Sequence, residues 1–217
     1  NTASEAYSMA MGGSSKAKGT FSVALGNTAT ASGHASFSQG ENSLASGAFS
    51  VSMGSTNTAS ETYSISMGYN NKSIANSSIS IGNSNISSGY TSVALGNNVI
   101  ASGRAAFAQG EDNLASGSYS VAMGGSNTAS ETYSVAMGGS SKATGTFSVA
   151  LGNTSTASGH ASFAQGDNTN ASGTFSVAMG SSTTASETYS VAMGGASKAT
   201  GTFSVALGNT STASGHA

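Results

Sequence analysis

The sequence contains no cysteine, proline or tryptophan, and only 6% of its 217 residues are charged. Without cysteine there can be neither a disulfide framework nor thiol chemistry. The net charge is −2 and there is no basic run, so nothing could neutralise phosphates and we expect no nucleic-acid partner. No apolar run approaches the roughly 18 residues that span a membrane. We therefore expect no membrane insertion in this segment.

The chain is rich in glycine, serine, threonine and alanine, and it repeats itself. Ser148–Ala161 and Ser204–Ala217 both read SVALGNTSTASGHA. From Ser8 onward the chain divides into fifteen repeats of fourteen residues without insertion or deletion, and residues 1–7 are the back half of a preceding repeat. We expect residues 1–217 to form a single repetitive domain. Because the chain starts within a repeat, we also expect it to be a piece of something longer.

Glycine sets the frame of the repeat. When each repeat is numbered from 0 at its first residue, position 4 is always glycine, and position 11 is glycine in most repeats. We predict that the position-4 glycines mark bends, since glycine tolerates positive φ and close backbone approach. They are Gly12, Gly26, Gly40, Gly54, Gly68, Gly82, Gly96, Gly110, Gly124, Gly138, Gly152, Gly166, Gly180, Gly194 and Gly208.

The segments between glycines have the length and pattern of strands. They are about five residues long, which is too short for helices. Position 1 is Val, Ile, Phe or Met, position 2 is Ala or Ser, and position 3 is Leu, Met, Ile or Gln, so large and small residues alternate with period two. The sequence predicts an all-β protein: a parallel β-roll, or β-solenoid, of 14-residue coils about 4.8 Å apart.

The aromatic residues follow a second rule. Thirteen of the fifteen stand at position 13, as do Phe147 and Tyr189, or at position 1 within the strand; Tyr69 and Tyr90 are the exceptions. Where position 1 is Phe, the preceding position 13 is alanine. We predict that the two positions share one buried strand face of fixed volume, with one large and one small residue in it. The three repeats of the second kind have Phe37, Phe107 and Phe163 at position 1.

The string Ser-Val-Ala-(Leu/Met)-Gly followed by Ala-Ser-Gly resembles the head repeats of YadA-like trimeric autotransporter adhesins. The segments at residues 34–40 and 160–166 (HASFSQG and HASFAQG) also resemble repeats of phage and bacterial surface-appendage fibres. The resemblance implies a left-handed β-roll, three chains packed side by side, and an extracellular or cell-surface location. The neck, coiled-coil stalk and membrane anchor of that family are not found in these residues.

Physical chemistry gives separate support for a homotrimer. A narrow coil of small residues buries little apolar surface for each residue that it orders, so a lone roll should be marginally stable. The face with Leu, Met, Val and aromatic residues should then gain from a neighbouring chain. Gln39, Gln109 and Gln165 replace Leu or Met at position 3. If this face meets partner chains, the glutamines would form polar layers that align the chains, or they would hold a water or an anion. The alternative is that they reach the surface from the edge of the face.

Two sets of polar residues could carry chemistry. His34, His160 and His216 share position 12, and we interpret them as solvated corner residues rather than a metal or pH-sensing site, because they lie four or more repeats apart. Four glutamates each precede a lysine by eleven residues, which predicts exposed ion pairs between adjacent coils. The pairs are Glu5 with Lys16, Glu61 with Lys72, Glu131 with Lys142, and Glu187 with Lys198.

No residue pattern predicts an enzyme or a cofactor. No serine has a histidine and an aspartate held near it, and no glycine run is followed by Lys-Ser/Thr. The leading hypothesis is a structural and adhesive surface rod that binds itself, as a homotrimer or filament, and an extracellular-matrix or cell-surface ligand. The first alternative is the repetitive shaft of a phage, spore or cell-surface fibre. An ice-binding solenoid is the third, although Lys72, Ile86, Ile100 and Leu114 interrupt the threonine row at position 8.

Overall fold

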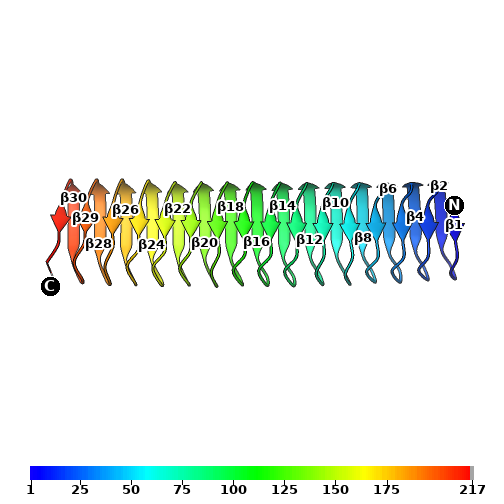
Figure 1. The fold of residues 1–217 in the computed structure, drawn as a ribbon, viewed down its shortest axis with the longest axis horizontal. Coiled ribbons are helices and arrows are strands. Elements are labelled where there is room, and N and C mark those ends of the chain that lie inside the picture. Colours follow the sequence, from blue (N-terminus) through cyan, green and yellow to red (C-terminus); the bar gives the residue numbers. More distant parts are fainter. Residues whose placement is uncertain (216–217) are drawn as a thin grey trace. The chain divides into compact units, whose positions relative to one another are not determined.

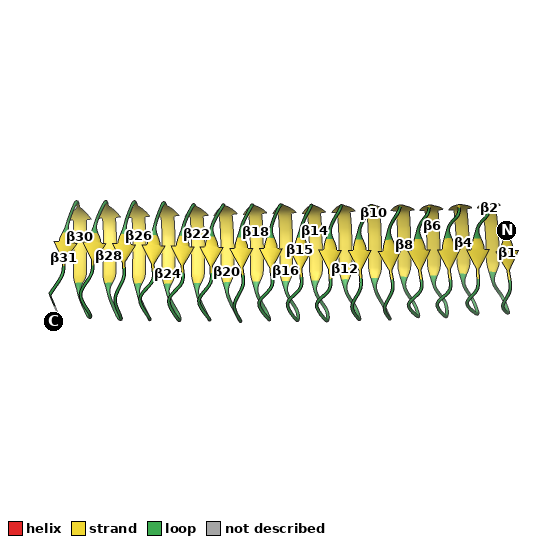
Figure 2. Ribbon diagram, viewed as in Figure 1, coloured by secondary structure: helices red, strands yellow, loops and turns green. Residues whose placement is uncertain are grey.

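The computed structural model describes residues 1–215, and the described chain is built from strands and turns without a helix. Figure 1 follows the strands in chain order, and Figure 2 shows the loops between them. Each 14-residue repeat contributes a strand of five residues and a strand of two residues. The chain divides into an N-terminal unit, Asn1–Glu111, and a C-terminal unit, Asp112–Ala217. This is the predicted all-β parallel β-solenoid.

The N-terminal unit contains β1 to β16. Its long strands are β2 (Met9–Gly13), β4 (Val23–Asn27), β6 (Phe37–Glu41), β8 (Val51–Ser55), β10 (Ile65–Tyr69), β12 (Ile79–Asn83), β14 (Val93–Asn97) and β16 (Phe107–Glu111). Its short strands are β1 (Thr2–Ala3), β3 (Lys16–Ala17), β5 (Thr30–Ala31), β7 (Leu44–Ala45), β9 (Thr58–Ala59), β11 (Lys72–Ser73), β13 (Ile86–Ser87) and β15 (Ile100–Ala101). Long strands pair only with long strands and short strands with short ones, so the unit has two sheets.

The C-terminal unit contains β17 to β31 in the same arrangement. Its long strands are β18 (Val121–Gly125), β20 (Val135–Gly139), β22 (Val149–Asn153), β24 (Phe163–Asp167), β26 (Val177–Ser181), β28 (Val191–Gly195) and β30 (Val205–Asn209). Its short strands are β17 (Leu114–Ala115), β19 (Thr128–Ala129), β21 (Lys142–Ala143), β23 (Thr156–Ala157), β25 (Asn170–Ala171), β27 (Thr184–Ala185), β29 (Lys198–Ala199) and β31 (Thr212–Ala213).

Pairing is parallel, and its register equals the sequence repeat. Val135 of β20 lies beside Val149 of β22, and Val149 lies beside Phe163 of β24. Each residue therefore meets the residue fourteen places further along the chain. Such pairing stacks equivalent positions into rows that run along the solenoid, so one repeat position describes a whole row of side chains.

The interior of each coil is filled by the small residues. Alanines at positions 2 and 9, such as Ala136 and Ala143, are completely buried. Serine at position 2 is buried as well, and its hydroxyl crosses the coil: Ser52 Oγ donates to the Asn57 carbonyl at 3.1 Å. Two sheets connected by such short turns leave no room between them for larger side chains. The core therefore consists of alanine, serine and small amides.

Buried asparagines at position 7 satisfy the backbone where the long strand ends. Asn127 Nδ2 donates to the carbonyls of Met123 and Gly138, both at 2.8 Å, while its Oδ1 accepts from the Ser141 N–H at 2.8 Å. Asn57 makes the equivalent contacts in the N-terminal unit, with Met53 and Gly68. Each amide thus links one coil to the next, and stacked amides of this kind form a ladder.

The position-4 glycines lie inside the long strands, as the fourth of their five residues. All fifteen have φ between 111° and 136°. A Cβ built on Gly124 would lie 2.1 Å from the Gly138 carbonyl oxygen, so backbone of adjacent coils approaches too closely for any side chain. Both properties anticipated for these glycines, positive φ and close approach, are present.

The corners are formed by other residues, so the prediction that the position-4 glycines mark the bends is wrong. Positions 6 and 13 adopt left-handed backbone, with φ between 50° and 59°, throughout the described chain. Serine, threonine, asparagine or aspartate usually occupies position 6, whereas Phe or Tyr often occupies position 13. Asparagine and aspartate tolerate this conformation, but bulky residues rarely adopt it. The aromatic corners must therefore be held by contacts, which the next section describes.

Candidate interaction surface

The long strands turn their larger side chains outward. In β18, Val121 and Met123 are half-buried while Ala122 between them is completely buried, and the other long strands show the same alternation. Some outward residues are more open, such as Met137 and Met193, each 37% exposed. We call this row of residues at positions 1 and 3 the apolar stripe. It runs through every repeat of each unit and contains no charged side chain.

This arrangement reverses one expectation. We predicted that positions 1 and 13 share one buried strand face, and within the single chain position 1 is not buried. The small-residue face lies inside the coil, because the narrow space between the two sheets suits small side chains such as alanine and serine. Phe37, Phe107 and Phe163 lie on the apolar stripe and are half-buried, in β6, β16 and β24.

Three glutamines interrupt the apolar stripe. Gln39 lies in register between Leu25 and Met53, and its side chain is exposed. Gln165 lies in the same way between Leu151 and Met179, and is also exposed. Gln109, beside Leu95, occupies the equivalent place in β16. The structure thus places each of the three on the apolar stripe of its own unit, beside Leu or Met.

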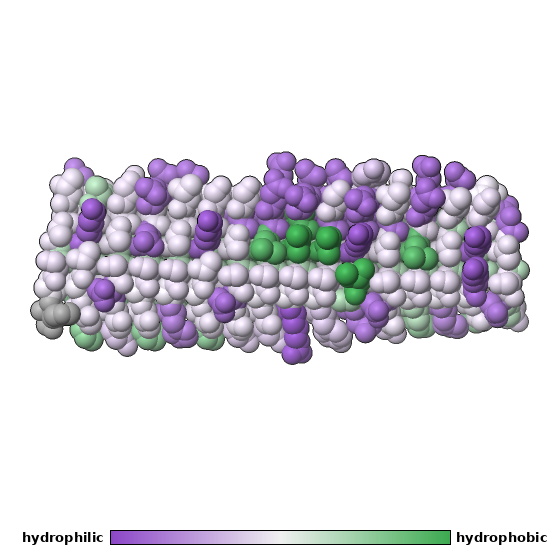
Figure 3. All heavy atoms as spheres, viewed as in Figure 1, coloured by the Kyte–Doolittle hydropathy of each residue, from purple (hydrophilic) through white to green (hydrophobic). Residues whose placement is uncertain are grey.

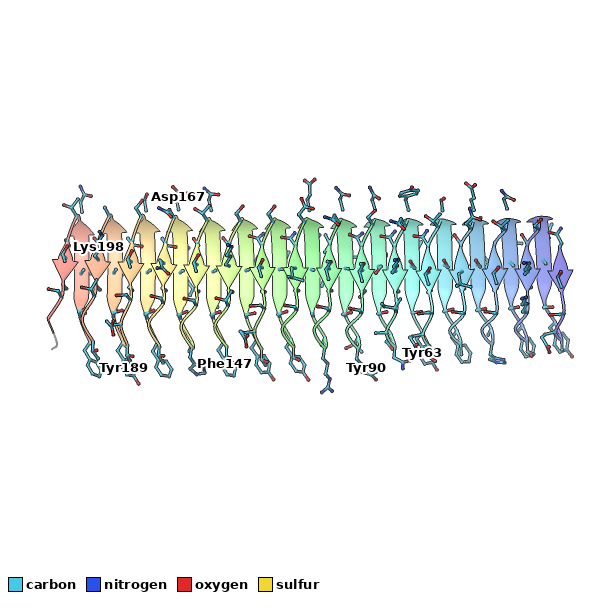
Figure 4. All side chains as sticks on the ribbon, in the orientation of Figure 1. Tyr63, Tyr90, Phe147, Asp167, Tyr189 and Lys198 are labelled. Atoms are coloured by element: carbon cyan, nitrogen blue, oxygen red, sulfur yellow. The ribbon has the colours of Figure 1, made fainter. Side chains whose placement is uncertain are left out.

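The aromatic residues at position 13 form a stack on the edge of the solenoid. In the C-terminal unit, Tyr133 and Phe147 have ring centroids 5.1 Å apart and planes 7° apart, and Tyr189 stacks on Phe203 at 5.0 Å. Phe147 is 51% exposed and Tyr189 is 47% exposed. Figure 4 shows both at the lower edge of the ribbon, outside the strands. The prediction that they share a buried strand face with position 1 is therefore wrong, since position 13 is a corner.

Histidine completes this aromatic stack beside two of the alanines at position 13, Ala35 and Ala161. His160 stands edge-on between Phe147 and Phe175, at 5.8 and 5.6 Å, and His34 stands likewise between Phe21 and Phe49. His34 and His160 are exposed corner residues, as predicted, but the sequence analysis missed their stacking. The signal was present: the alanines that precede Phe37 and Phe163 are themselves preceded by histidine. His216 lies outside the described residues.

The aromatic stack should stabilise the corners modestly. Phe147→Ala keeps a residue type that already occupies this left-handed position, at Ala161, so the backbone cost is unchanged. It removes the ring contacts with Tyr133 and His160, each worth about 0.5–1.5 kcal/mol. We expect a loss of about 1–2 kcal/mol in the free energy of unfolding, measured by denaturant titration. Phe147→Leu, which keeps apolar bulk, should lose less; equal losses would show that ring stacking contributes nothing.

The opposite edge of the solenoid is polar. Asn153 Nδ2 donates to Asp167 Oδ1 at 2.7 Å across adjacent repeats, and Asn97 pairs in the same way with Glu111 at 3.3 Å. Thr28 Oγ1 donates to Asn42 Oδ1 at the equivalent corner. Figure 4 shows Asp167 at the upper edge, away from the aromatic stack. The edge therefore offers hydrogen-bonding groups with little net charge.

The predicted glutamate–lysine ion pairs do not form in residues 1–215. Glu131, for example, begins the turn before β20 and is held by its backbone: its N–H donates to Ser134 Oγ at 3.2 Å, and that hydroxyl donates back to its carbonyl at 2.6 Å. Lys142 lies on the outward face of the short strand β21 and is exposed. An eleven-residue offset thus brings the residues to neighbouring repeats but not to the same corner. Within one chain this prediction is wrong; the other alternative, ion pairs between chains, stays a prediction.

The described part of the chain encloses no ligand-sized cavity. Within residues 1–215, no three residues among His, Asp and Glu gather as they would around a metal ion. None of the described residues forms a helix long and apolar enough to cross a membrane. The face seen in Figure 3 is mostly hydrophilic or neutral, with strongly apolar side chains in only a few places. The described surface therefore consists of broad faces rather than enclosed sites.

Comparison with known families agrees with this repeat architecture. The family model described as "YadA head domain repeat (2 copies)" matches the chain ten times between residues 3 and 216. The matched ranges are 3–29, 26–50, 45–71, 73–98, 101–127, 129–155, 157–183, 171–197, 185–211 and 199–216. No curated protein matches the chain.

Proposed function

The chain belongs to the YadA head-repeat family, and from this we propose that it is the repetitive part of a trimeric adhesive head at a cell surface. In this proposal the chain is a structural binding module without catalytic activity. Its partners are two further copies of itself and a ligand on a host or neighbouring surface, such as extracellular matrix. The family match carries the proposal, and two features of the surface support it.

The first supporting feature is the apolar stripe. Val, Ile, Leu and Met side chains cover positions 1 and 3 of nearly every long strand and remain partly open to solvent in the single chain. A continuous uncharged row of this kind is typical of the core of a protein interface, where charged residues are depleted. The coil interior buries mainly alanine, serine and asparagine side chains, which supply little apolar surface. Packing the stripe against two other copies would supply the apolar burial that the interior lacks.

The second feature is the polarity of the edge opposite the aromatic stack and of most short strands. The edge with Asn153 and Asp167 and the short strands with their threonines and lysines carry hydrogen-bonding groups on each repeat. A ligand that contacts several repeats would gain affinity from many weak, equivalent contacts. Such a repetitive surface suits attachment to an extended partner such as a matrix fibre.

A charge placed in the apolar stripe tests the proposal. Met137→Glu puts a carboxylate where a buried interface should lie, and its desolvation should oppose assembly. Thr144→Glu is the matched control, because it introduces the same negative charge at an exposed residue just after the short strand β21. We expect Thr144→Glu to keep three times the 20.9 kDa chain mass in light scattering, and Met137→Glu to lose it.

The same two variants test adhesion. Beads coated with the Thr144→Glu protein should bind immobilised extracellular-matrix proteins, and beads with Met137→Glu should bind several-fold less because each particle offers one chain instead of three. If Met137→Glu remains trimeric, the apolar stripe is not the interface. If trimers form but bind no surface, the adhesive half of the proposal is wrong.

A further inference from the structure

A trimer made of repeats faces a problem of alignment. The long strands β22 and β30 have the same sequence, VALGN, and all long strands except β6, β16 and β24 carry only Val, Ile, Leu or Met at positions 1 and 3. If one chain shifts past its neighbours by a whole repeat, one aliphatic layer simply replaces another. Register is weakly specified wherever the pattern repeats without a distinguishing residue. Something else in the apolar stripe must distinguish the correct alignment.

Three strands of the apolar stripe differ, β6, β16 and β24: each has Phe at position 1 and Gln at position 3, and the glutamine is the polar residue of the two. In the single chain, the side-chain amides of Gln39 and Gln165 make no hydrogen bond within residues 1–215, although they stand among Leu and Met. An amide both donates and accepts hydrogen bonds, so glutamines at the same height in three chains can satisfy one another. Opposite Leu or Met, the same amide would be buried without a partner, which is unfavourable.

We propose that Gln39, Gln109 and Gln165 fix the alignment of the three chains, and that the unequal spacing of these glutamines makes the alignment unique. This inference rests on the trimer proposed above. Five repeats separate Gln39 from Gln109, but only four separate Gln109 from Gln165. If one chain is shifted by four repeats, Gln109 of one chain therefore lies at the height of Gln165 of the other. The remaining glutamines of both chains then lie opposite aliphatic residues. A five-repeat shift matches only Gln39 with Gln109, and every other shift within the chain matches at most one pair.

The unequal spacing comes from one additional repeat. Elsewhere the chain follows a cycle of four repeats, with Lys at position 8, His (once Arg104) at position 12, Gln at position 3 and Glu at position 11. One more repeat stands between Ser64 and Thr91, within the interval from Gln39 to Gln109. With equal intervals of four repeats, a four-repeat shift would match two of the three glutamines. The additional repeat thus makes the four-repeat shift less favourable, and this is the shift that the four-repeat cycle would otherwise favour.

Disulfide trapping can detect that shift, because the natural chain has no cysteine. Leu95 and Leu151 both occupy position 3 and lie four repeats apart. We would refold a tagged Leu95→Cys chain together with an untagged Leu151→Cys chain and oxidise them gently. Only a four-repeat shift brings the two cysteines close enough to bond, since a disulfide requires Cα atoms within about 7 Å. The mixed disulfide is identified by its mass on a non-reducing gel.

The comparison uses two deletions of one repeat. Removing residues 78–91 leaves equal intervals of four repeats between the glutamines, whereas removing residues 176–189 leaves the intervals of five and four unchanged. We expect the first deletion to raise the mixed disulfide by on the order of tenfold over the second, because one further glutamine layer is matched in the shifted trimer. In the full-length chain, the triple variant Gln39→Leu, Gln109→Leu and Gln165→Leu should also give more mixed disulfide than the natural sequence.

Light scattering of each sample, before oxidation, separates the two proposals. If the samples are not trimers, the proposed function fails at that step. If they are trimers and the two deletions give equal amounts of mixed disulfide, the glutamines do not set the alignment and this inference is wrong. If the triple glutamine variant gives no more mixed disulfide than the natural sequence, the inference is likewise overturned.

Discussion

Gly124→Ala is expected to destabilise the protein by about 3 kcal/mol or more, although it adds a single methyl group. Gly124 has φ of +113°, and its added Cβ would lie 2.1 Å from the Gly138 carbonyl oxygen of the next coil. The backbone conformation and the contact both oppose the substitution, and the obstructing atom belongs to a backbone that cannot move without disturbing the strand pairing. Denaturant titration of the variant measures the loss.

The adjacent glycine is the matched control. Gly125 precedes the left-handed corner at Ser126, and a Cβ built on it meets nothing within 4 Å. Gly125→Ala should therefore change the free energy of unfolding by about 0.5 kcal/mol or less. If the two neighbouring substitutions had equal effects, the close approach of successive coils at position 4 would be disproved.

Asn127→Ala is the second substitution with a large expected effect. It leaves the carbonyls of Met123 and Gly138 and the N–H of Ser141 without the partners that the amide supplies. A buried polar group without a partner costs about 1–3 kcal/mol, so we expect a total loss of about 3 kcal/mol or more. Amide hydrogen exchange adds a local readout, because the Ser141 N–H should lose protection together with the overall stability.

Asn127→Ser is the informative companion to this variant. Serine already stands at position 7 in other repeats, and Ser141 Oγ donates to the Gly152 carbonyl at 3.0 Å. We expect Asn127→Ser to recover part of the stability lost by Asn127→Ala, since one of the three contacts can form again. A serine variant as unstable as the alanine variant would show that the hydrogen bonds of position 7 contribute little.

The sequence predicted the architecture well because the repeat is simple. A constant 14-residue period, a glycine at position 4 and alternation over positions 1 to 3 predicted short parallel strands, and each strand does pair with the strand fourteen residues away. The conformational reason for the glycines was also predictable, since positive φ and close backbone approach are what glycine alone permits. The handedness of the coil stays a prediction from the family resemblance.

Alternation could not reveal which strand face lies inside. The usual expectation places large apolar residues in the core, and here Ala122 is inside while Val121 and Met123 point outward. The deciding factor is the width of the coil, which depends on the tertiary structure and not on any one strand. Position 7 was missed for a related reason: asparagine ordinarily signals an exposed turn, whereas Asn57 and Asn127 are completely buried and bonded on all sides.

The candidate surface was only partly predictable. The three glutamines were identified from their place in the Leu and Met row, which is visible in the sequence. The aromatic stack was not, because Phe147 and Tyr189 adopt a left-handed conformation that bulky residues rarely take, and no local rule predicts it. His160 joins their stack from the neighbouring position, so its contact partners follow from the geometry of the corner.

The most direct measurement is the native mass of the unmodified protein, by light scattering over a range of concentrations together with electron microscopy of the same samples. The apolar stripe predicts a discrete particle of three times the 20.9 kDa chain mass, unchanged on dilution to micromolar concentration. A stable monomer would contradict the assignment of the stripe as an interface. Long filaments of uniform width would contradict the closed trimer and favour the fibre alternative.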